Sequence, residues 1–195
     1  MPRTAEIHRT TRETDIRLTL DLDGSGKAEI ATGIGFFDHM LDLFARHGLF
    51  DLTVAARGDL HVDQHHTVED VGICLGQALR EALGDRSGIA RYGHALAPMD
   101  EALLLAAVDV SGRAYYAGDL DVYGRAIGGF DAELAPEFFR ALAMNGLITL
   151  HLRQLAGENT HHIVEGAFKA VARALDAATR RDERVQGVPS TKGVL

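Results

Sequence analysis

The chain has 195 residues, 46% of them hydrophobic, and a formal net charge of −8. A chain of this length and composition can bury a core of its own, as one domain or as two small ones. Because nucleic acids and acidic membrane surfaces attract positively charged proteins, the negative balance argues against both as partners.

The sequence shows no sign of export or of membrane insertion. Its single cysteine, Cys74, cannot form a disulfide within the chain, and small secreted proteins usually depend on such bonds. The N-terminal residues form no apolar signal segment, and no apolar run is long enough to cross a bilayer. We therefore predict a cytoplasmic protein.

The first half of the sequence predicts strands followed by a helix, a strand and a helix. Hydrophobic and polar residues alternate at 16–22 and 27–32, as in strands with one buried face. Residues 36–48 have helical apolar spacing and end in glycine. Another strand over 51–58 leads into a helix over 65–83, where apolar residues recur at three- and four-residue steps.

The second half predicts the same order. Strand patterns at 103–110 and 113–118 precede a helix over 136–146, a strand over 149–157 and a helix over 160–179. We count three strands before the first helix of each half. The turn-forming segment at 84–88 separates the halves, and residues 180–195 form a tail with no regular pattern.

The two halves are also similar in sequence. HMLDLFARHGLFDL at 39–52 aligns with EFFRALAMNGLITL at 137–150, HHTVED at 65–70 with HHIVEG at 161–166, and ETDIRLTLDL at 13–22 with EALLLAAVDV at 101–110. Such a repeat indicates two copies of one structural unit. We predict an α+β fold of two βββαβα halves, 1–87 and 88–195, which pack their helices together.

Each copy of the repeat contains an adjacent pair of histidines, at 65–66 and 161–162. On a helix, residues four apart share a face, whereas neighbours are turned by about 100°. The first histidine of each pair can therefore act with the glutamate four residues later, Glu69 or Glu165. The second histidine points elsewhere, so each pair supplies ligands to two different centres.

One HHxxE segment alone is as well explained by a solvated helix start. Surface histidines have no reason to repeat in register, so the second copy favours a metal site. Imidazole nitrogen and carboxylate oxygen without thiolate suit manganese, iron or zinc. The nearby acidic residues Asp63 and Asp70 are candidates to orient the imidazoles.

Several segments along essentially the whole chain carry a family resemblance. They are RETDI, GIGFFDHML, FARHG, DQHHTVEDVG, ARYGHALAPMDEAL, DVSGRAYY, PEFFRALA, TLHLRQLAGENTHHIVEGAFKAVARAL and PSTKGVL. Taken together, they resemble the imidazoleglycerol-phosphate dehydratase family. The resemblance implies a fold like that of ribosomal protein S5 domain 2, with the helices between two mixed four-stranded sheets.

The resemblance also implies two manganese ions in each active site, with iron(II) or zinc as substitutes. One centre is implied to use His39, His66, His161 and Glu165, and the other His65, Glu69, Glu137 and His162. Family members draw these ligands from neighbouring subunits, which implies a homo-oligomer of 24 subunits with active sites at the interfaces. Many members carry histidine where this sequence has Glu137, which leaves His94 and His151 as alternative ligands.

The implied reaction is the loss of water from imidazole glycerol phosphate in histidine biosynthesis, which gives imidazole acetol phosphate. The hydrogen to be removed is not acidic, because no carbonyl group flanks it. Metal ions on both ring nitrogens would lower the pKa of the imidazole, as they do for bound water. Our mechanistic hypothesis is that the metal-bound imidazolate expels the adjacent hydroxyl, and that the resulting diazafulvene loses a proton from the next carbon.

Acid and base steps require carboxylates close to the carbon chain of the substrate. Glu13 matches the family's catalytic carboxylate and is our first candidate, with Asp100 second, although solvated strand-start and turn residues look the same in a sequence. Glu165 and Lys169 complete the candidate catalytic set. Lys169 lies one helical turn beyond Glu165 and can face the same site.

The substrate phosphate requires charge-assisted donors, for which arginine is well shaped. The residues that match the family's substrate-binding positions are Glu13, His39, His47, Arg91, Arg113, Lys169, Ser190, Thr191 and Lys192. Without the resemblance, the PSTKG segment of the tail would be predicted to fray and His47 to be a helix-end charge.

Two other functions use the same ligands. A two-metal hydrolase would release inorganic phosphate from a phosphate ester. A metal-assembled shell or storage protein would need neither Glu13 nor the arginines. A nucleic-acid-binding module fits least well, because no basic stripe interleaved with aromatic residues is present.

Overall fold

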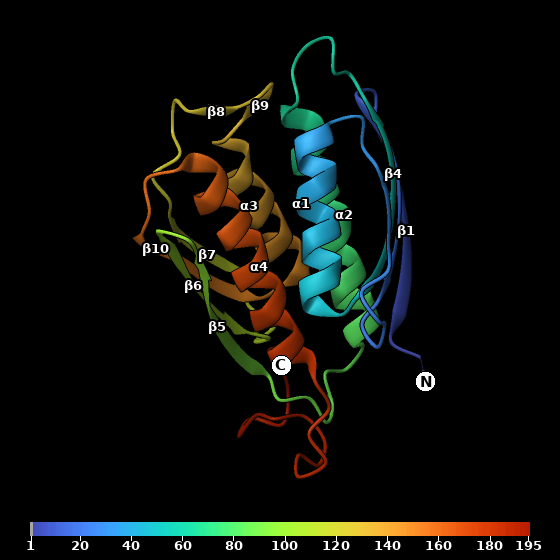
Figure 1. Cartoon of the computed structure of the whole chain (residues 1–195). Coiled ribbons are helices and arrows are strands. Elements are labelled where there is room, and N and C mark those ends of the chain that lie inside the picture. Colours follow the sequence, from blue (N-terminus) through green and yellow to red (C-terminus); the bar gives the residue numbers. More distant parts are fainter. Residues whose placement is uncertain (1) are drawn as a thin grey trace.

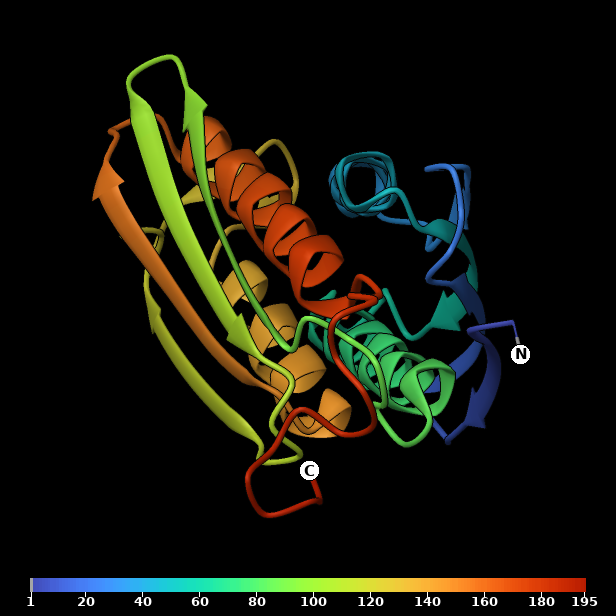
Figure 2. The same cartoon turned by 90° about the horizontal axis from the view of Figure 1, so that it is seen from below.

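The computed structural model describes residues 2–195 and has two layers of β-sheet with the helices between them (Figures 1 and 2). The first half consists of β1 (Thr4–Thr10), β2 (Thr14–Asp21), β3 (Ala28–Ala31), α1 (Gly35–Gly48), β4 (Asp51–Gly58) and α2 (His65–Leu83). The second half consists of β5 (Tyr92–Met99), β6 (Ala102–Asp109), β7 (Tyr115–Asp119), the short β8 (Ala126–Ile127) and β9 (Phe130–Asp131), α3 (Leu134–Gly146), β10 (Thr149–Ala156) and α4 (Thr160–Thr179).

Each half forms its own four-stranded sheet, with the orders β1-β2-β4-β3 and β5-β6-β10-β7. In each sheet one edge strand, β3 or β7, runs parallel to its neighbour, and the other pairs are antiparallel. The predicted fold class is confirmed, and α2 and α4 have the predicted limits. The segment at 84–88, where we place the boundary between the halves, connects α2 to β5. The β8–β9 ribbon was not predicted.

Both α1 and α3 end at the predicted glycine, but the left-handed residue is the leucine that follows. Leu49 has φ 57° and Leu147 has φ 51°. Gly48 is required for a different reason, because a Cβ atom there would lie 2.4 Å from the ring of Phe50. At the end of α1, glycine is therefore required by close packing and not by its backbone conformation.

The core lies where the two halves join through their helices, with α2 against α3 and α1 against α4. Phe138 of α3 is fully buried there, stacks on Phe168 of α4 with 5.1 Å between ring centroids, and meets Phe37 of α1 at 5.4 Å. One aromatic side chain thus ties three helices from both halves.

Phe138→Ala is expected to lower the free energy of unfolding by about 3–5 kcal/mol, because it removes a large buried ring and leaves a cavity. Denaturant unfolding of metal-free protein measures this loss. Leu155→Ala is the matched control: its side chain is 54% exposed, so the change should stay within about 0.5 kcal/mol. Equal effects of the two substitutions would contradict a core joined at Phe138.

All four long helices begin at the same end of the molecule, the upper end of Figure 1. The candidate ligands lie near these starts: His39 is the fifth residue of α1 and Glu137 the fourth of α3. One histidine pair opens α2, and the other forms the second and third residues of α4. The tail after α4 lies at the opposite end (Figure 1). No helix among residues 2–195 combines the length and apolar character needed to cross a membrane.

Candidate active site and metal centres

The two histidine pairs occupy matching helix starts. Asp63 Oδ1 accepts a hydrogen bond from the backbone N–H of His65 at 2.8 Å, and Asn159 Oδ1 accepts one from that of His161 at 2.9 Å. Within each pair the rings lie 6.3 and 6.2 Å apart, at interplanar angles of 85° and 83°. The two imidazoles of a pair therefore diverge, as helical spacing predicts.

The first ligand cluster consists of His39, His161 and Glu165, whose ligand atoms all lie within 4.8 Å of one another. Glu165 Oε2 is 3.1 Å from His161 Nε2 and 3.7 Å from His39 Nε2. Its other oxygen, Oε1, is 2.6 Å from Lys169 Nζ. Burial opposes ionisation of Glu165, but hydrogen bonds from Lys169 and His161 outweigh it and lower the pKa. The buried carboxylate is therefore an anion that faces two imidazoles.

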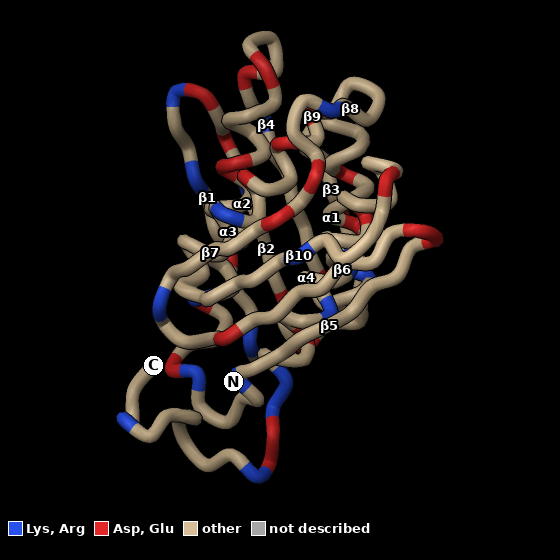
Figure 3. Tube along the Cα trace, turned by 90° about the vertical axis from the view of Figure 1, so that its left-hand side faces the viewer, with Lys and Arg blue, Asp and Glu red and all other residues tan. Residues whose placement is uncertain are grey.

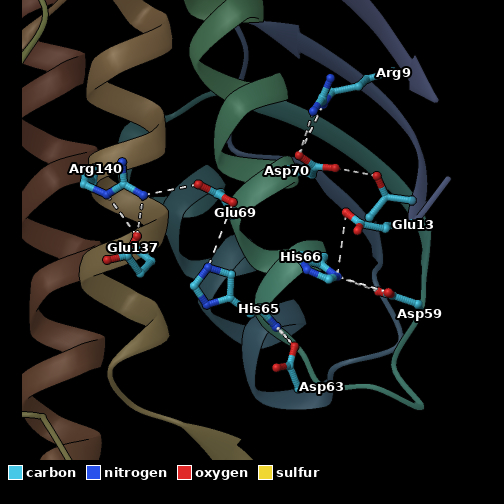
Figure 4. A network of polar contacts seen from close by, with 11 residues as sticks. Arg9, Glu13, Asp59, Asp63, His65, His66, Glu69, Asp70, Glu137 and Arg140 are labelled. Atoms are coloured by element: carbon cyan, nitrogen blue, oxygen red, sulfur yellow. Dashed lines mark hydrogen bonds and ion pairs between the residues drawn. The ribbon is translucent and has the colours of Figure 1, made fainter. Parts of the chain in front are cut away.

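The second ligand cluster consists of His65, Glu69 and Glu137, again within 4.8 Å (Figure 4). Glu69 Oε2 lies 4.0 Å from His65 Nε2, and its Oε1 accepts a hydrogen bond from Arg140 at 3.2 Å. Arg140 also donates twice to Glu137 Oε2, at 2.6 and 2.9 Å. Each carboxylate thus keeps one oxygen that Arg140 does not engage. Arg140 was not predicted from the sequence, where it looks like any arginine on a helix surface.

The second histidine of the first pair lies outside both clusters. His66 Nδ1 is 3.0 Å from Asp59 Oδ2 and 3.8 Å from Glu13 Oε2 (Figure 4). The hydrogen bond to Asp59 and the negative charge of Glu13 raise the pKa of His66. The Glu13 side chain remains 54% exposed. A candidate catalytic carboxylate therefore stands beside an imidazole without being bound to it.

The second histidine of the other pair also lies outside the clusters, and its imidazole is held more tightly. His162 Nδ1 is 2.7 Å from Glu101 Oε2, and its Nε2 is 3.8 Å from Asp100 Oδ2. The hydrogen bond to Glu101 raises the pKa of His162, and together with backbone N–H groups it lowers the pKa of Glu101 to about 2. Asp100 lies in the β5–β6 turn with φ 49°.

The expected acidic partners of the imidazoles differ from the observed ones. Asp63 accepts a hydrogen bond from the backbone N–H of His65, and Asp70 is directed at the first sheet, so neither contacts an imidazole. Asp59 and Glu101 have this role instead. Glu101 is the repeat counterpart of Glu13 and was within reach of sequence reasoning, whereas nothing in the sequence singles out Asp59.

Neither alternative ligand, His94 or His151, belongs to a ligand cluster in residues 2–195. His94 lines a cavity with His47 and Arg46, and His151 lies 5.9 Å from the ring of Tyr115. Glu137 therefore remains the predicted ligand in the second cluster.

Lys169 lies beside the first ligand cluster, but the other predicted phosphate ligands gather around one cavity of about 970 Å³ at the tail end of the molecule. Its lining includes Arg91, Arg113, Ser190, Thr191 and Lys192. The tail is held there because the Arg91 guanidinium donates to the carbonyl of Pro189 at 2.8 Å and to Asp109 at 2.7 Å. Basic positions are numerous around the tail at the lower end of Figure 3, whereas acidic positions dominate the opposite end.

The phosphate cavity and the ligand clusters are far apart within one chain. The backbone N–H of Arg91 donates to the carbonyl of Ala178, 17 residues after His161 on α4. At a rise of 1.5 Å per residue this corresponds to about 25 Å. His47 lies between the two regions, where burial and the positive charge of Lys169 lower its pKa. A small substrate cannot reach both regions of the same chain.

Comparison with known proteins gives one consistent result. The family model for imidazoleglycerol-phosphate dehydratase matches residues 32–175. The chain belongs to this family. It is 61% identical to the imidazoleglycerol-phosphate dehydratase of Desulforamulus reducens over 193 residues, which cover 99% of this chain and 98% of the relative, and 62% identical to that of Symbiobacterium thermophilum, with 99% and 93% covered.

Solved structures of the family have the same fold. The crystal structure of imidazoleglycerol-phosphate dehydratase from Staphylococcus aureus matches with a TM-score of 0.83 and 38% identity, over 92% of this chain and 99% of the other. The enzyme from Pyrococcus furiosus, in complex with (S)-C348, matches with a TM-score of 0.84 and 44% identity, over 97% and 100%. The chain is thus a hydro-lyase of histidine biosynthesis that dehydrates imidazole glycerol phosphate, and neither a phosphate-ester hydrolase nor a non-catalytic shell protein.

Proposed function

We propose that the dehydration takes place at sites shared between copies of the chain. Each site would combine the ligand clusters of one copy with the phosphate cavity of another. The separation of about 25 Å along α4 between these two regions carries this proposal, because both must contact one small substrate. His66 and His162, which lie outside the clusters, would complete the ligand sets from neighbouring copies.

The residues of the two clusters fit divalent metal ions. Each cluster offers imidazole nitrogen and carboxylate oxygen, already within 4.8 Å, and no thiolate. Such a donor set suits manganese, with iron(II) and zinc as substitutes. Metal ions bound there would act as Lewis acids that lower the pKa of the substrate's imidazole and make the ring a source of electrons. The ligands would be His39, His161, Glu165 and His66 in one centre and His65, Glu69, Glu137 and His162 in the other.

Glu13 is the carboxylate we assign to proton transfer on the carbon chain. Its repeat counterpart, Glu101, accepts hydrogen bonds from His162 and from the backbone N–H of Asn159 and is not free to move a proton. In the first half Asp59 accepts from the imidazole instead, so the carboxylate of Glu13 is left available. Asp100 is our second choice, because it lies at the same distance from an imidazole, 3.8 Å, as Glu13 does.

The basic residues would orient the substrate and neutralise its phosphate. The ammonium group of Lys169 lies 2.6 Å from Glu165 Oε1, beside the first cluster, and would orient the reacting end of the substrate. His39 in that cluster and His47, the second-last residue of α1, would contact the substrate from the same copy. From the second copy, Arg91 and Arg113 would bind the phosphate together with the tail residues Ser190, Thr191 and Lys192.

Shared sites imply a homo-oligomer, and we propose the 24-subunit shell and the cytoplasmic location expected for this family. Two observations support sharing. The second histidine of each pair, His66 or His162, belongs to neither ligand cluster. The Arg113 side chain is 70% exposed although it lines the phosphate cavity.

Mixing two variants of reduced turnover tests whether sites are shared. Lys169→Ala and Arg113→Ala should each lower turnover by about 10- to 100-fold, the effect of losing a hydrogen bond between charged groups. If the variants are dissociated by metal removal and reassembled together, some sites receive both native residues and turnover rises above that of either parent. In the control, each variant is reassembled alone and the two preparations are mixed afterwards. Turnover that stays at the mean of the parents would show that each site belongs to one copy.

A further inference from the structure

A buried polar cluster joins the first sheet to α2 (Figure 4). Asp70, only 7% exposed, accepts hydrogen bonds on Oδ1 from Arg9 Nε and Nη2, at 3.2 and 3.0 Å. Its Oδ2 accepts one from Thr14 Oγ1 at 2.5 Å, and Thr14 is only 4% exposed. Both oxygens of the buried carboxylate are therefore engaged at the junction of β1, β2 and α2.

The second half has no such cluster at the equivalent place. The repeat counterparts of the three residues are Ala97, Ala102 and Gly166. The strand registers agree, since residues 9 and 16 pair in the first sheet and residues 97 and 104 in the second. A side chain at Gly166 would point at the same junction, because a Cβ atom there would lie 2.6 Å from Leu104.

The fold therefore does not require the polar cluster. Burial of a carboxylate costs free energy that its partners only offset, and replacing a buried ion pair by apolar residues is often neutral or stabilising. The second half contains such apolar residues and forms the same junction of strands and helix. The polar cluster of the first half thus needs a reason other than stability.

The polar cluster fixes the turn that carries Glu13. Thr11 Oγ1 accepts hydrogen bonds from the backbone N–H of Glu13 and of Thr14, at 3.0 and 2.9 Å, and lies 3.2 Å from Thr14 Oγ1. On the other side, the carbonyl of Glu13 accepts from the N–H of Asp59 at 3.1 Å. The backbone of Glu13 is thereby held on both sides, and Thr14 Oγ1 ties it to the helix that presents His66.

We propose that Arg9, Thr14 and Asp70 are positioning residues for Glu13. Glu101 needs no such support, because His162 and backbone N–H groups bind its carboxylate directly. The Glu13 carboxylate accepts no hydrogen bond from another side chain of residues 2–195, so the backbone beneath it must define its place. This inference rests on the acid–base role proposed above for Glu13.

A double-mutant cycle between Thr14 and Glu13 tests the proposal in the assembled, manganese-loaded enzyme. Thr14→Val removes the hydroxyl but keeps the shape, and should lower kcat by about 10- to 100-fold, the effect of displacing a catalytic group by about 1 Å. KM and manganese content should stay near wild type, whereas the unfolding midpoint should fall, because the buried Asp70 carboxylate loses a partner. Thr14→Ser should recover most of kcat and of the unfolding midpoint. Thr19→Val, on the exposed face of the same strand, is the matched control.

The decisive measurement is Thr14→Val in a Glu13→Gln background. If Thr14 acts through Glu13, the substitution should cause almost no further loss there. The same loss in both backgrounds, or wild-type turnover of Thr14→Val, would overturn the positioning role. Wild-type turnover of Glu13→Gln alone would instead show that the role proposed for Glu13 is wrong.

Discussion

Removal of divalent metal is expected to abolish ketone formation from imidazole glycerol phosphate, and manganese is expected to restore it. In the mechanism we propose, the imidazole ring supplies the electrons, because the carbon that loses its hydrogen has no flanking carbonyl. Lewis-acid stabilisation is worth several kcal/mol, and its loss corresponds to about 10³-fold in turnover or more. The measurement is ketone formation by chelator-treated protein, with metal content determined on the same sample.

Magnesium and calcium are the controls, because these hard cations prefer all-oxygen sites and should not replace manganese at imidazole ligands. Particle size should be followed in parallel, since His66 and His162 lie outside the clusters of their own chain. Stripped protein is expected to be smaller and to reassemble with manganese. Full turnover by protein shown to be free of metal would exclude the proposed centres, and release of inorganic phosphate would contradict the assigned reaction.

The fold could be predicted because its determinants are local and occur twice. Helical periodicity gave the limits of α2 and α4, and the repeat showed that both halves share one topology. The β8–β9 ribbon was missed because strands of two residues have no period to detect. The first strand of each half was counted but not located. In β1 only Ile7 is fully buried, and the buried face of β5 consists of the small residues Gly93, Ala95 and Ala97, so neither strand has a strong alternation of large apolar residues.

The candidate site could be predicted only as far as each side chain's direction follows from its own helix. Divergence within the histidine pairs is such a property, and it agrees with the observed ring angles. Contacts between distant segments do not follow from one helix alone. Arg140 contacts Glu69, 71 positions away in the sequence, and Arg9 contacts Asp70, 61 positions away. No spacing rule predicts such pairs, so the partners of the ligands had to come from the structure.

Glu13→Gln is expected to lower kcat by about 10²- to 10⁴-fold, the usual contribution of a general acid or base. The amide keeps the shape of the side chain but cannot take up a proton at neutral pH. Manganese content should not change, because Glu13 belongs to neither ligand cluster. Steady-state kinetics together with metal analysis measures both quantities, and Glu6→Gln, on the exposed face of β1, is the matched control.

Glu101→Gln separates proton transfer from support of a metal ligand. Glu101 holds the imidazole of His162 at 2.7 Å, and loss of such a partner typically weakens metal binding by about 10- to 100-fold. The turnover of Glu101→Gln should therefore recover when the manganese concentration is raised, whereas that of Glu13→Gln should not. The two glutamates occupy equivalent positions of the repeat, so a difference between them arises from what each contacts. If excess manganese rescued Glu13→Gln as well, both residues would only support the imidazoles, and Asp100 would become the first candidate for proton transfer.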